Sequence, residues 1–146
     1  FNMVKIEELT SFLANVPLFQ ELNNRQLKKI ASRFTPRTYH PDDVIVTQGK
    51  SGFGMFMVIS GHANAVVELA DGSKTAVNEF GPADFFGEVT MLDGGPRTAS
   101  VVATEETKCL LLDRIEFIAL MHRDAEMATK IAVALAKRLR HTTSMI

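Results

Sequence analysis

Glycine is confined to the central part of this 146-residue chain. All nine glycines lie between Gly49 and Gly95, and the segments on either side contain none. Glycine is favoured where a turn needs a positive φ, and it weakens helices and strands from within. The distribution therefore predicts a turn-rich centre between two flanks that are free to form helices.

The flank before the first glycine predicts two helices. The first, Val4–Val16, has apolar residues at spacings of three and four, and Pro17 ends it. A second helix follows, capped by Asn23 or Asn24. The apolar faces are formed by Ile6, Leu9 and Leu13 in the first helix and by Leu27, Ile30, Ala31 and Phe34 in the second.

The centre, from Thr38 to Asp113, predicts a small antiparallel barrel or jelly roll. Short β-like runs alternate there with turns that contain Gly, Pro, Asn or Asp. Met55–Ile59 and Cys109–Leu112 are apolar without alternation, so we expect both of their faces to be covered, with the C-terminal helices as the second cover. The predicted strands are Val44–Thr47, Met55–Ser60, Ala63–Leu69, Thr75–Phe80, Thr98–Ala103 and Lys108–Asp113.

The flank after the last glycine predicts two further helices. Asp113 and Glu116 have the spacing of a capping box that opens the first, and a break is expected near Arg123-Asp124. The second helix runs from Asp124 to about Thr143 and carries two apolar stripes. One is expected to face the barrel and the other, at heptad-like spacing, to pair with a second copy of the chain. The stripe expected to face the barrel consists of Met127, Ile131 and Ala134. The stripe expected to face a partner consists of Ala128, Ala132, Leu135, Leu139, Thr142 and Ile146.

Composition excludes several classes of protein. The length corresponds to one domain, predicted to span residues 1–146. One cysteine cannot form an internal disulfide or hold an iron–sulfur cluster, and the four histidines lack the spacing of a metal site. A net charge of −1 provides no bulk attraction to nucleic acid or anionic lipid. No stretch resembles a membrane span or a secretory signal, so a cytoplasmic location is expected.

The stretch from Phe85 to Val101 carries the chemistry. It is too long for a hairpin turn and has too few apolar residues for a strand. Gly87 permits close backbone approach, and the residues after it can open a short helix whose free N–H groups bind an anion. Arg97 adds a planar fork for phosphate oxygens with the Thr98 hydroxyl beside it, and Glu88 is an acceptor suited to a sugar hydroxyl. Phosphate donors next to a ribose acceptor predict a nucleotide.

This stretch closely resembles the phosphate-binding cassette of the cyclic-nucleotide-binding domain family. Phe86-Gly87-Glu88 and Pro96-Arg97-Thr98-Ala99 carry the resemblance, which extends to the turns at Gln48-Gly49 and Ser60-Gly61. The departures from the family's usual residues are Phe53 in place of an acidic residue, Ala83 in place of Gly, and Thr90 in place of Ala or Ser.

The resemblance implies an architecture that is mainly β with flanking helices. Residues 36–113 are expected to form an eight-stranded antiparallel β-roll, a jelly roll or double-stranded β-helix, with the cassette at 86–99. Helices are expected at residues 1–35, and two more at 114–146.

The resemblance also implies a ligand. Arg97 is expected to pair with a cyclic phosphate, Thr98 to bond a phosphate oxygen, and Glu88 to accept the ribose 2′-hydroxyl. The ligand is not transformed, and neither a cofactor nor a metal is implied. The ligand-binding residues expected in the cassette are Gly87, Glu88, Val89, Thr90, Arg97, Thr98 and Ala99.

Two sequence features bear on which base the cyclic nucleotide carries. A threonine after the arginine, as at Thr98, occurs in relatives that bind cyclic GMP and in others that bind cyclic AMP. The end of the chain resembles the dimer helix of the bacterial catabolite activators, in which hydroxyl residues matching Thr142 and Thr143 contact adenine. The resemblance therefore favours cyclic AMP, with cyclic GMP as the alternative, and a homodimer through the C-terminal helix.

The expected function is a sensor that passes ligand occupancy through its C-terminal helices to an effector. The effector can be a transcription factor, a channel or a kinase, and the chain itself is not expected to contact nucleic acid. An enzyme is not expected, because the cassette offers no activated nucleophile and no metal cluster. One alternative is a surface ion pair between Glu88 and Arg97 without a ligand. Another is a structural or dimerisation module of the same fold.

Overall fold

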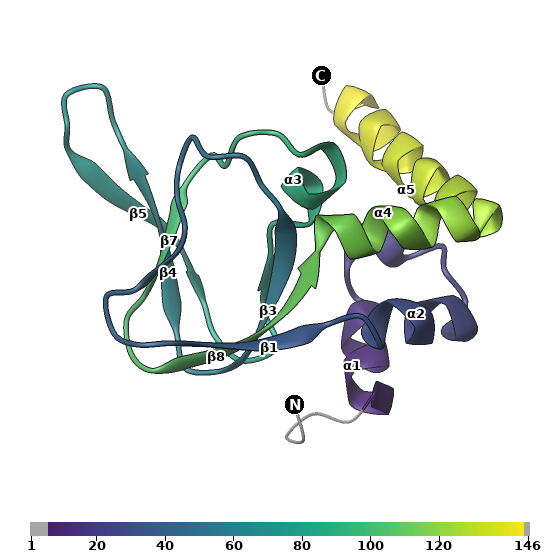
Figure 1. Cartoon of the computed structure of the whole chain (residues 1–146). Helices are drawn as coiled ribbons and strands as arrows, with labels where there is room; N and C mark the ends of the chain where they lie inside the picture. The colour runs from purple at the N-terminus through teal and green to yellow at the C-terminus, as the bar shows by residue number, and fades with distance from the viewer. Residues whose placement is uncertain (1–5, 145–146) are drawn as a thin grey trace. The chain divides into compact units, whose positions relative to one another are not determined.

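The strands of the central stretch form two antiparallel sheets (Figure 1). The structure, a computed structural model, describes residues 6–144, and side chains as far as residue 142. The strand order is β1-β8-β3-β6 in one sheet and β2-β7-β4-β5 in the other, so the predicted eight-stranded antiparallel β-roll is confirmed. The strands are β1 (Thr35–Tyr39), β2 (Val44–Val46), β3 (Gly54–Ser60), β4 (Ala63–Glu68), β5 (Lys74–Phe80), β6 (Phe85–Phe86), β7 (Ser100–Ala103) and β8 (Thr107–Asp113).

The chain divides into two compact units. The β-roll unit comprises residues 34–115 and contains the eight strands and the short helix α3 (Glu88–Asp93). The helical unit combines described residues from both ends of the chain, 6–33 and 116–144. That residues 1–146 form one domain stays a prediction.

Apolar side chains from both sheets form the core of the β-roll. Phe86 stacks on Phe56 with a distance of 5.2 Å between ring centroids. Met55–Val58 and Cys109–Leu112 are buried at every position and Ile59 is half-buried, so the prediction that both faces of these runs are covered is confirmed except at Ile59. That the C-terminal helices form the second cover stays a prediction. Burial raises the pKa of the Cys109 thiol to about 12, so this side chain behaves as a small buried hydrophobe.

The sequence pattern does not predict β1 and β6. Strand β1 contains Pro36, which removes a backbone donor and is tolerated because β1 lies at the edge of its sheet. Strand β6 is only Phe85–Phe86, paired with Met57 and Phe56 of β3. Two residues cannot show an alternating pattern, so both strands depend on the neighbours that they meet in the sheet.

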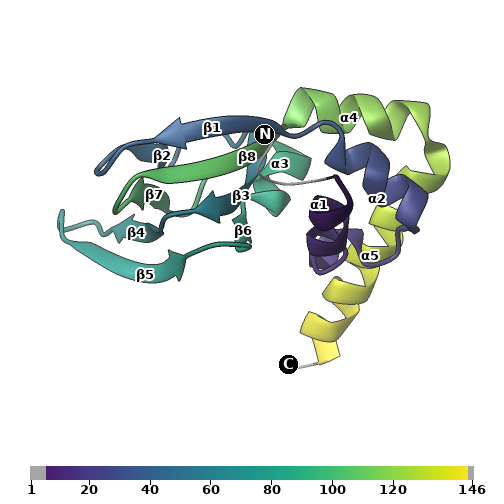
Figure 2. The same ribbon diagram turned by 90° about the horizontal axis from the view of Figure 1, so that it is seen from below.

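The helical unit is held together by packing between its helices (Figure 2). Of the two predicted caps, Asn23 is the one that caps α2, through a reciprocal capping box with Gln26. Helix α1 packs against α2, α5 packs against η1, and the rings of Phe19 and Phe117 lie 6.1 Å apart. The helices are α1 (Ile6–Leu13), η1 (Pro17–Phe19), α2 (Asn24–Ala31), α4 (Arg114–Arg123) and α5 (Ala125–Ser144).

Helix α4 begins without the predicted capping box. The carboxylate of Asp113 accepts a hydrogen bond from the N–H of Ile115 at 2.8 Å. The carboxylate of Glu116 accepts instead from Arg33, at 3.3 Å. Asp113 therefore caps α4 as predicted, but the reciprocal bond of the capping box is missing because an arginine distant in sequence binds the Glu116 carboxylate.

Helix α5 begins after the break predicted at Arg123-Asp124, and Asp124 caps it by accepting from the N–H of Met127 at 3.0 Å. The stripe predicted to face the barrel is buried, but its assignment to the barrel stays a prediction. Of the seam predicted for a partner, Ala128 and Leu135 are half-buried, Ala132, Leu139 and Thr142 are exposed, and Ile146 lies outside the described residues.

Candidate functional site

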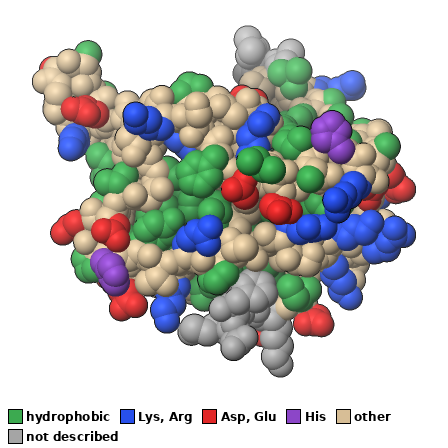
Figure 3. Space-filling model, in the orientation of Figure 1, with side chains coloured by type: hydrophobic (Ala, Val, Ile, Leu, Met, Phe, Trp, Pro, Cys, Tyr) green, Lys and Arg blue, Asp and Glu red, His purple; other side chains and the backbone are tan. Residues whose placement is uncertain are grey.

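A cavity of about 460 Å³ opens into the β-roll. This volume lies within the range of about 300–1,000 Å³ that is typical of small-molecule sites. Figure 3 shows hydrophobic side chains gathered over the roll, and most of the cavity wall is apolar. Every residue that lines the cavity belongs to the β-roll unit. Those contributed by strands are Val46, Ala65, Val77, Asn78, Phe80, Phe86 and Val101.

The cassette forms the polar end of this cavity. Every residue that the sequence predicts to bind ligand in the cassette lines it, and the helix expected after Gly87 is α3. The first backbone bond of this helix runs from the N–H of Met91 to the carbonyl of Gly87 at 2.9 Å. The N–H groups of Glu88, Val89 and Thr90 precede that bond, as expected for a first helical turn.

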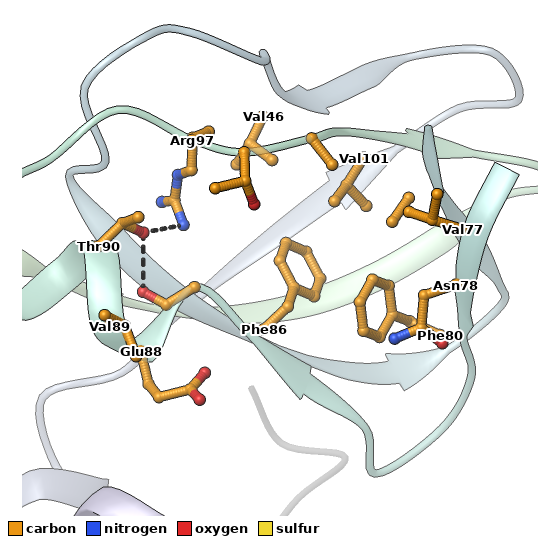
Figure 4. A pocket seen from close by; sticks show the side chains of 14 residues that line it. Val46, Val77, Asn78, Phe80, Phe86, Glu88, Val89, Thr90, Arg97 and Val101 are labelled. Carbon is orange, nitrogen blue, oxygen red and sulfur yellow. Dashed lines mark hydrogen bonds between the residues drawn. The ribbon is translucent and has the colours of Figure 1, made fainter. Parts of the chain in front are cut away.

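Arg97 is the buried charge of the site, with 6% of its surface exposed. Its Nη1 donates to the hydroxyl oxygen of Thr90 at 2.6 Å, and its Nη2 donates to the carbonyl of Gly54 at 2.6 Å. The Thr90 hydroxyl in turn donates to the carbonyl of Gly87 at 3.2 Å (Figure 4). Because a guanidinium has five N–H donors, these two bonds leave donors for an anion. Arg97 is buried and forms no ion pair with Glu88 among the described residues, so the alternative of a surface pair between them was wrong.

The backbone on both sides of Arg97 is tied to the segment after β2. The N–H of Arg97 donates to the carbonyl of Lys50, the N–H of Gly49 to the carbonyl of Arg97, and the N–H of Gly52 to the carbonyl of Gly95, each at 2.8 Å. The backbone at Arg97 is therefore positioned by a segment that lies far from it in the sequence.

Gly87 is required at its position for two reasons. Its φ is +85°, which L side chains rarely adopt, and a Cβ there would overlap Nη1 of Arg97. The predicted close approach at Gly87 is therefore an approach to the arginine of the same chain.

The electrostatics of the site favour an anion. Burial lowers the pKa of Arg97, and the nearby Glu88 carboxylate acts in the opposite direction. Arginine stays charged under all ordinary conditions, so the cavity contains a desolvated cation. Such a cation gains strongly from a bound anion, because a charge buried without a partner is costly.

Ala83 is one of the departures from the family's usual residues, standing where glycine is usual. It lies in the turn before β6 with a φ of +72°, a left-handed conformation in which glycine is unstrained. Its N–H donates to the carbonyl of Val58 at 2.8 Å, and the N–H of Val58 donates to the carbonyl of Asp84 at 2.8 Å. These two bonds hold the turn in place.

Thr142 and Thr143 belong to the helical unit and are not among the residues that line the cavity. The hydroxyl of Thr142 donates to the carbonyl of Arg138 at 3.0 Å, and the side chain of Thr143 lies outside the described part of the structure. Their contact with a base stays a prediction. Sequence reasoning also missed the wall formed by β5, although Asn78 is a polar residue within a predicted strand.

The profile of the cyclic nucleotide-binding domain matches residues 36–124. The chain belongs to this family. Among relatives, it is 36% identical over 124 residues to the cyclic AMP receptor protein of Thermus thermophilus, covering 85% of this chain and 57% of the relative. It is 38% identical over 106 residues to the regulatory subunit of a cAMP-dependent protein kinase from Colletotrichum orbiculare, covering 73% of this chain and 26% of the relative.

Solved structures of the family have the same fold. The N-terminal domain of a transcriptional regulator from Streptomyces coelicolor superposes with a TM-score of 0.82 at 28% identity, covering 91% of this chain and 95% of that domain. The catabolite activator protein of Thermus thermophilus superposes with a TM-score of 0.68 at 34% identity, covering 88% of this chain and 61% of that protein's chain. This cyclic nucleotide-binding domain thus spans little more than half of the Thermus receptor and about a quarter of the kinase subunit.

Within residues 6–144, no helix is long and apolar enough to cross a membrane. The same described residues contain no group of three or more His, Cys, Asp or Glu side chains suited to a metal ion.

Proposed function

We propose that this chain is a regulatory domain that binds cyclic AMP and does not transform it. The observation that carries the proposal is the buried guanidinium of Arg97 at the polar end of an otherwise largely apolar cavity. A cyclic nucleotide has one anionic phosphodiester, a ribose and an aromatic base with apolar faces. These parts follow the same order as the donors, the Glu88 acceptor and the apolar wall of the cavity.

In the proposed complex, Arg97 donates to the phosphate oxygens with the N–H groups that its protein contacts leave over. Thr98 and the first-turn N–H groups of α3 add further donors, and Glu88 accepts from the ribose 2′-hydroxyl. The purine lies against Val46, Ala65 and Val101, whose side chains line the cavity. Burying an aromatic ring on such a wall contributes roughly 25 cal/mol per Å² of apolar surface removed from water.

Cyclic AMP is preferred because of the relatives. Those named above are a cyclic AMP receptor and the regulatory subunit of a cAMP-dependent kinase. Cyclic GMP is the second candidate, because the hydroxyl of Thr98 lines the cavity and could reach a guanine as well as a phosphate.

Arg114 supports the proposal that occupancy is transmitted to the C-terminal helices. It is the first residue of α4, yet its Nη2 donates to the carbonyl of Leu92 in α3 at 3.3 Å, and its backbone N–H donates to the carbonyl of Phe53. The Nε of Arg114 is buried and has no hydrogen-bond partner among the described residues. A shift of α3 on ligand binding would therefore act directly on the start of α4, and a ligand biases two states only when it binds one of them better.

We further propose that α5 joins two copies of the chain. The support is the heptad-like spacing of Ala132, Leu135 and Leu139, with 69% of Leu139 exposed. The effector and a cytoplasmic location also stay predictions.

Thermal unfolding with cyclic AMP, cyclic GMP and 5′-AMP tests the proposed function. A ligand at 100 times its Kd stabilises the folded state by about 2.7 kcal/mol, so the midpoint should rise with cyclic AMP, less with cyclic GMP, and little with 5′-AMP. If no cyclic nucleotide shifts the midpoint, the chain is the structural module that the sequence left as an alternative. A larger shift with cyclic GMP would reverse the order of the two ligands.

A further inference from the structure

One polar side chain in the cavity wall lies outside the cassette. Strand β5 contributes Val77, Asn78 and Phe80 to the wall, and among these three Asn78 has a side chain that can form hydrogen bonds. In the β4–β5 register, Asn78 is opposite Ala65, whose side chain belongs to the core and also lines the cavity. Cross-strand partners share a face of the sheet, so Asn78 lies on the cavity side of β5, although it is exposed to solvent like most of this strand.

A bulge in β5 creates this arrangement. Ala65 pairs with Asn78 while the next residue of β4, Val66, pairs with Ala76, so Val77 is an extra residue without a cross-strand partner. A bulge re-aims neighbouring side chains, and here both Val77 and Asn78 line the cavity although successive residues of a regular strand point to opposite faces.

The hydrogen bonding of Asn78 determines which of its atoms can meet a ligand. Its Oδ1 accepts a hydrogen bond from the backbone N–H of Glu79 at 2.9 Å, and an N–H group requires oxygen on that side of the amide. Figure 4 shows the amide nitrogen on the other side of the amide group, turned away from the strand. Asn78 therefore offers the cavity N–H donors, and its oxygen is already engaged.

We propose that Asn78 is a specificity-determining residue that donates a hydrogen bond to an acceptor atom on the edge of the bound base. The inference rests on the proposed function, because Arg97 and Glu88 hold the phosphate and ribose and so direct the base along the apolar wall. Purines carry ring-nitrogen acceptors, and guanine adds an oxygen. A base whose facing edge has only donors is disfavoured, since it would leave the Asn78 amide unpaired.

A thermodynamic cycle tests this role. Calorimetry measures the affinity of the intact chain and of Asn78→Ala for cyclic AMP and for indole riboside 3′,5′-cyclic phosphate, an analogue of similar shape whose ring system has no nitrogen acceptor. The intact chain should prefer cyclic AMP more than Asn78→Ala does, by about 3- to 10-fold, the range expected for one hydrogen bond. If Asn78→Ala weakens the binding of cyclic AMP and of the analogue by the same factor, the base does not interact with Asn78 and the proposal is overturned.

Asn64→Ala is the matched control. Asn64 lies on the neighbouring strand β4 between two core residues, so its side chain is on the opposite face, where it lines a separate hollow with Gln48 and Lys74. This variant should keep the full preference of the intact chain, and losing it would also overturn the assignment. If the intact chain binds neither compound, the proposed function itself fails, which is distinct from a chain that binds cyclic AMP without any coupling to Asn78.

Discussion

At the cassette end of the cavity, a buried arginine is held by side-chain and backbone hydrogen bonds from three segments of the roll, whereas at the β5 end the wall is exposed and lies on the edge strand of its sheet. Arg97 is 6% exposed and Val77 is 56% exposed. A preorganised charge binds an anion with little loss of conformational entropy, whereas an edge strand can adjust to different bases. We therefore propose that affinity comes from the cassette end and discrimination from the β5 end.

The largest effect is expected for Arg97→Ala. It leaves a bound phosphate without its charged partner in a desolvated site, so the binding free energy of cyclic AMP should fall by about 2–5 kcal/mol in calorimetry. Arg37→Ala is the control, because Arg37 is an exposed arginine of β1 whose guanidinium donates to the neighbouring carbonyl of Pro36. Equal affinities for Arg97→Ala and the intact chain would refute the cassette as the source of affinity.

The next effect is expected for Gly87→Ala. The positive φ makes an alanine cost about 1–2 kcal/mol of unfolding free energy, and its Cβ would also displace the guanidinium of Arg97. Gly72→Ala has the same φ of +85° with nothing within 4 Å of the added Cβ, so it measures backbone strain alone. Denaturant unfolding should show the larger loss for Gly87→Ala, and calorimetry should show weakened cyclic AMP binding for that variant only. Similar values for the two would mean that the contact with Arg97 is unimportant.

A smaller effect, of opposite sign, is expected for Ala83→Gly. Glycine relieves the left-handed strain at φ +72° but makes the unfolded chain more flexible, which offsets part of the gain. The unfolding free energy should rise by about 0.5–1 kcal/mol in urea denaturation. A decrease would indicate that the turn before the cassette is not strained by its alanine.

The smallest effect on stability is expected for Val77→Ala at the β5 end. An exposed side chain contributes little to the folded state, so the unfolding free energy should stay within about 0.5 kcal/mol. Binding should weaken measurably, because two methyl groups are lost from the cavity wall. The comparison between the two ends would fail if Val77→Ala destabilised the fold as much as Gly87→Ala.

Much of the cassette could be predicted from the sequence. Gly87, the helix after it, and Arg97 follow one another closely in the chain, and their chemistry is readable from residue types. The capping of α2 by Asn23, one of the two predicted caps, and the break at Arg123-Asp124 are equally local, and both were predicted correctly.

The failures share a physical cause, which is dependence on partners distant in sequence. Strand β6 exists because β3 pairs with it, and Glu116 leaves its expected cap because Arg33 meets it. The position of Asn78 on the cavity side of β5 depends on a register shift between β4 and β5 that no local pattern records.

The sequence by itself therefore determined the family, most of the strands and helices, and the identity of the charged group, because these depend on residues that are near one another in the chain. The tertiary structure alone decided that Arg97 is buried against Thr90 and Gly54, and that Asn78 faces the same cavity from the far side of the roll. Burial and cross-strand register arise only when distant segments pack together.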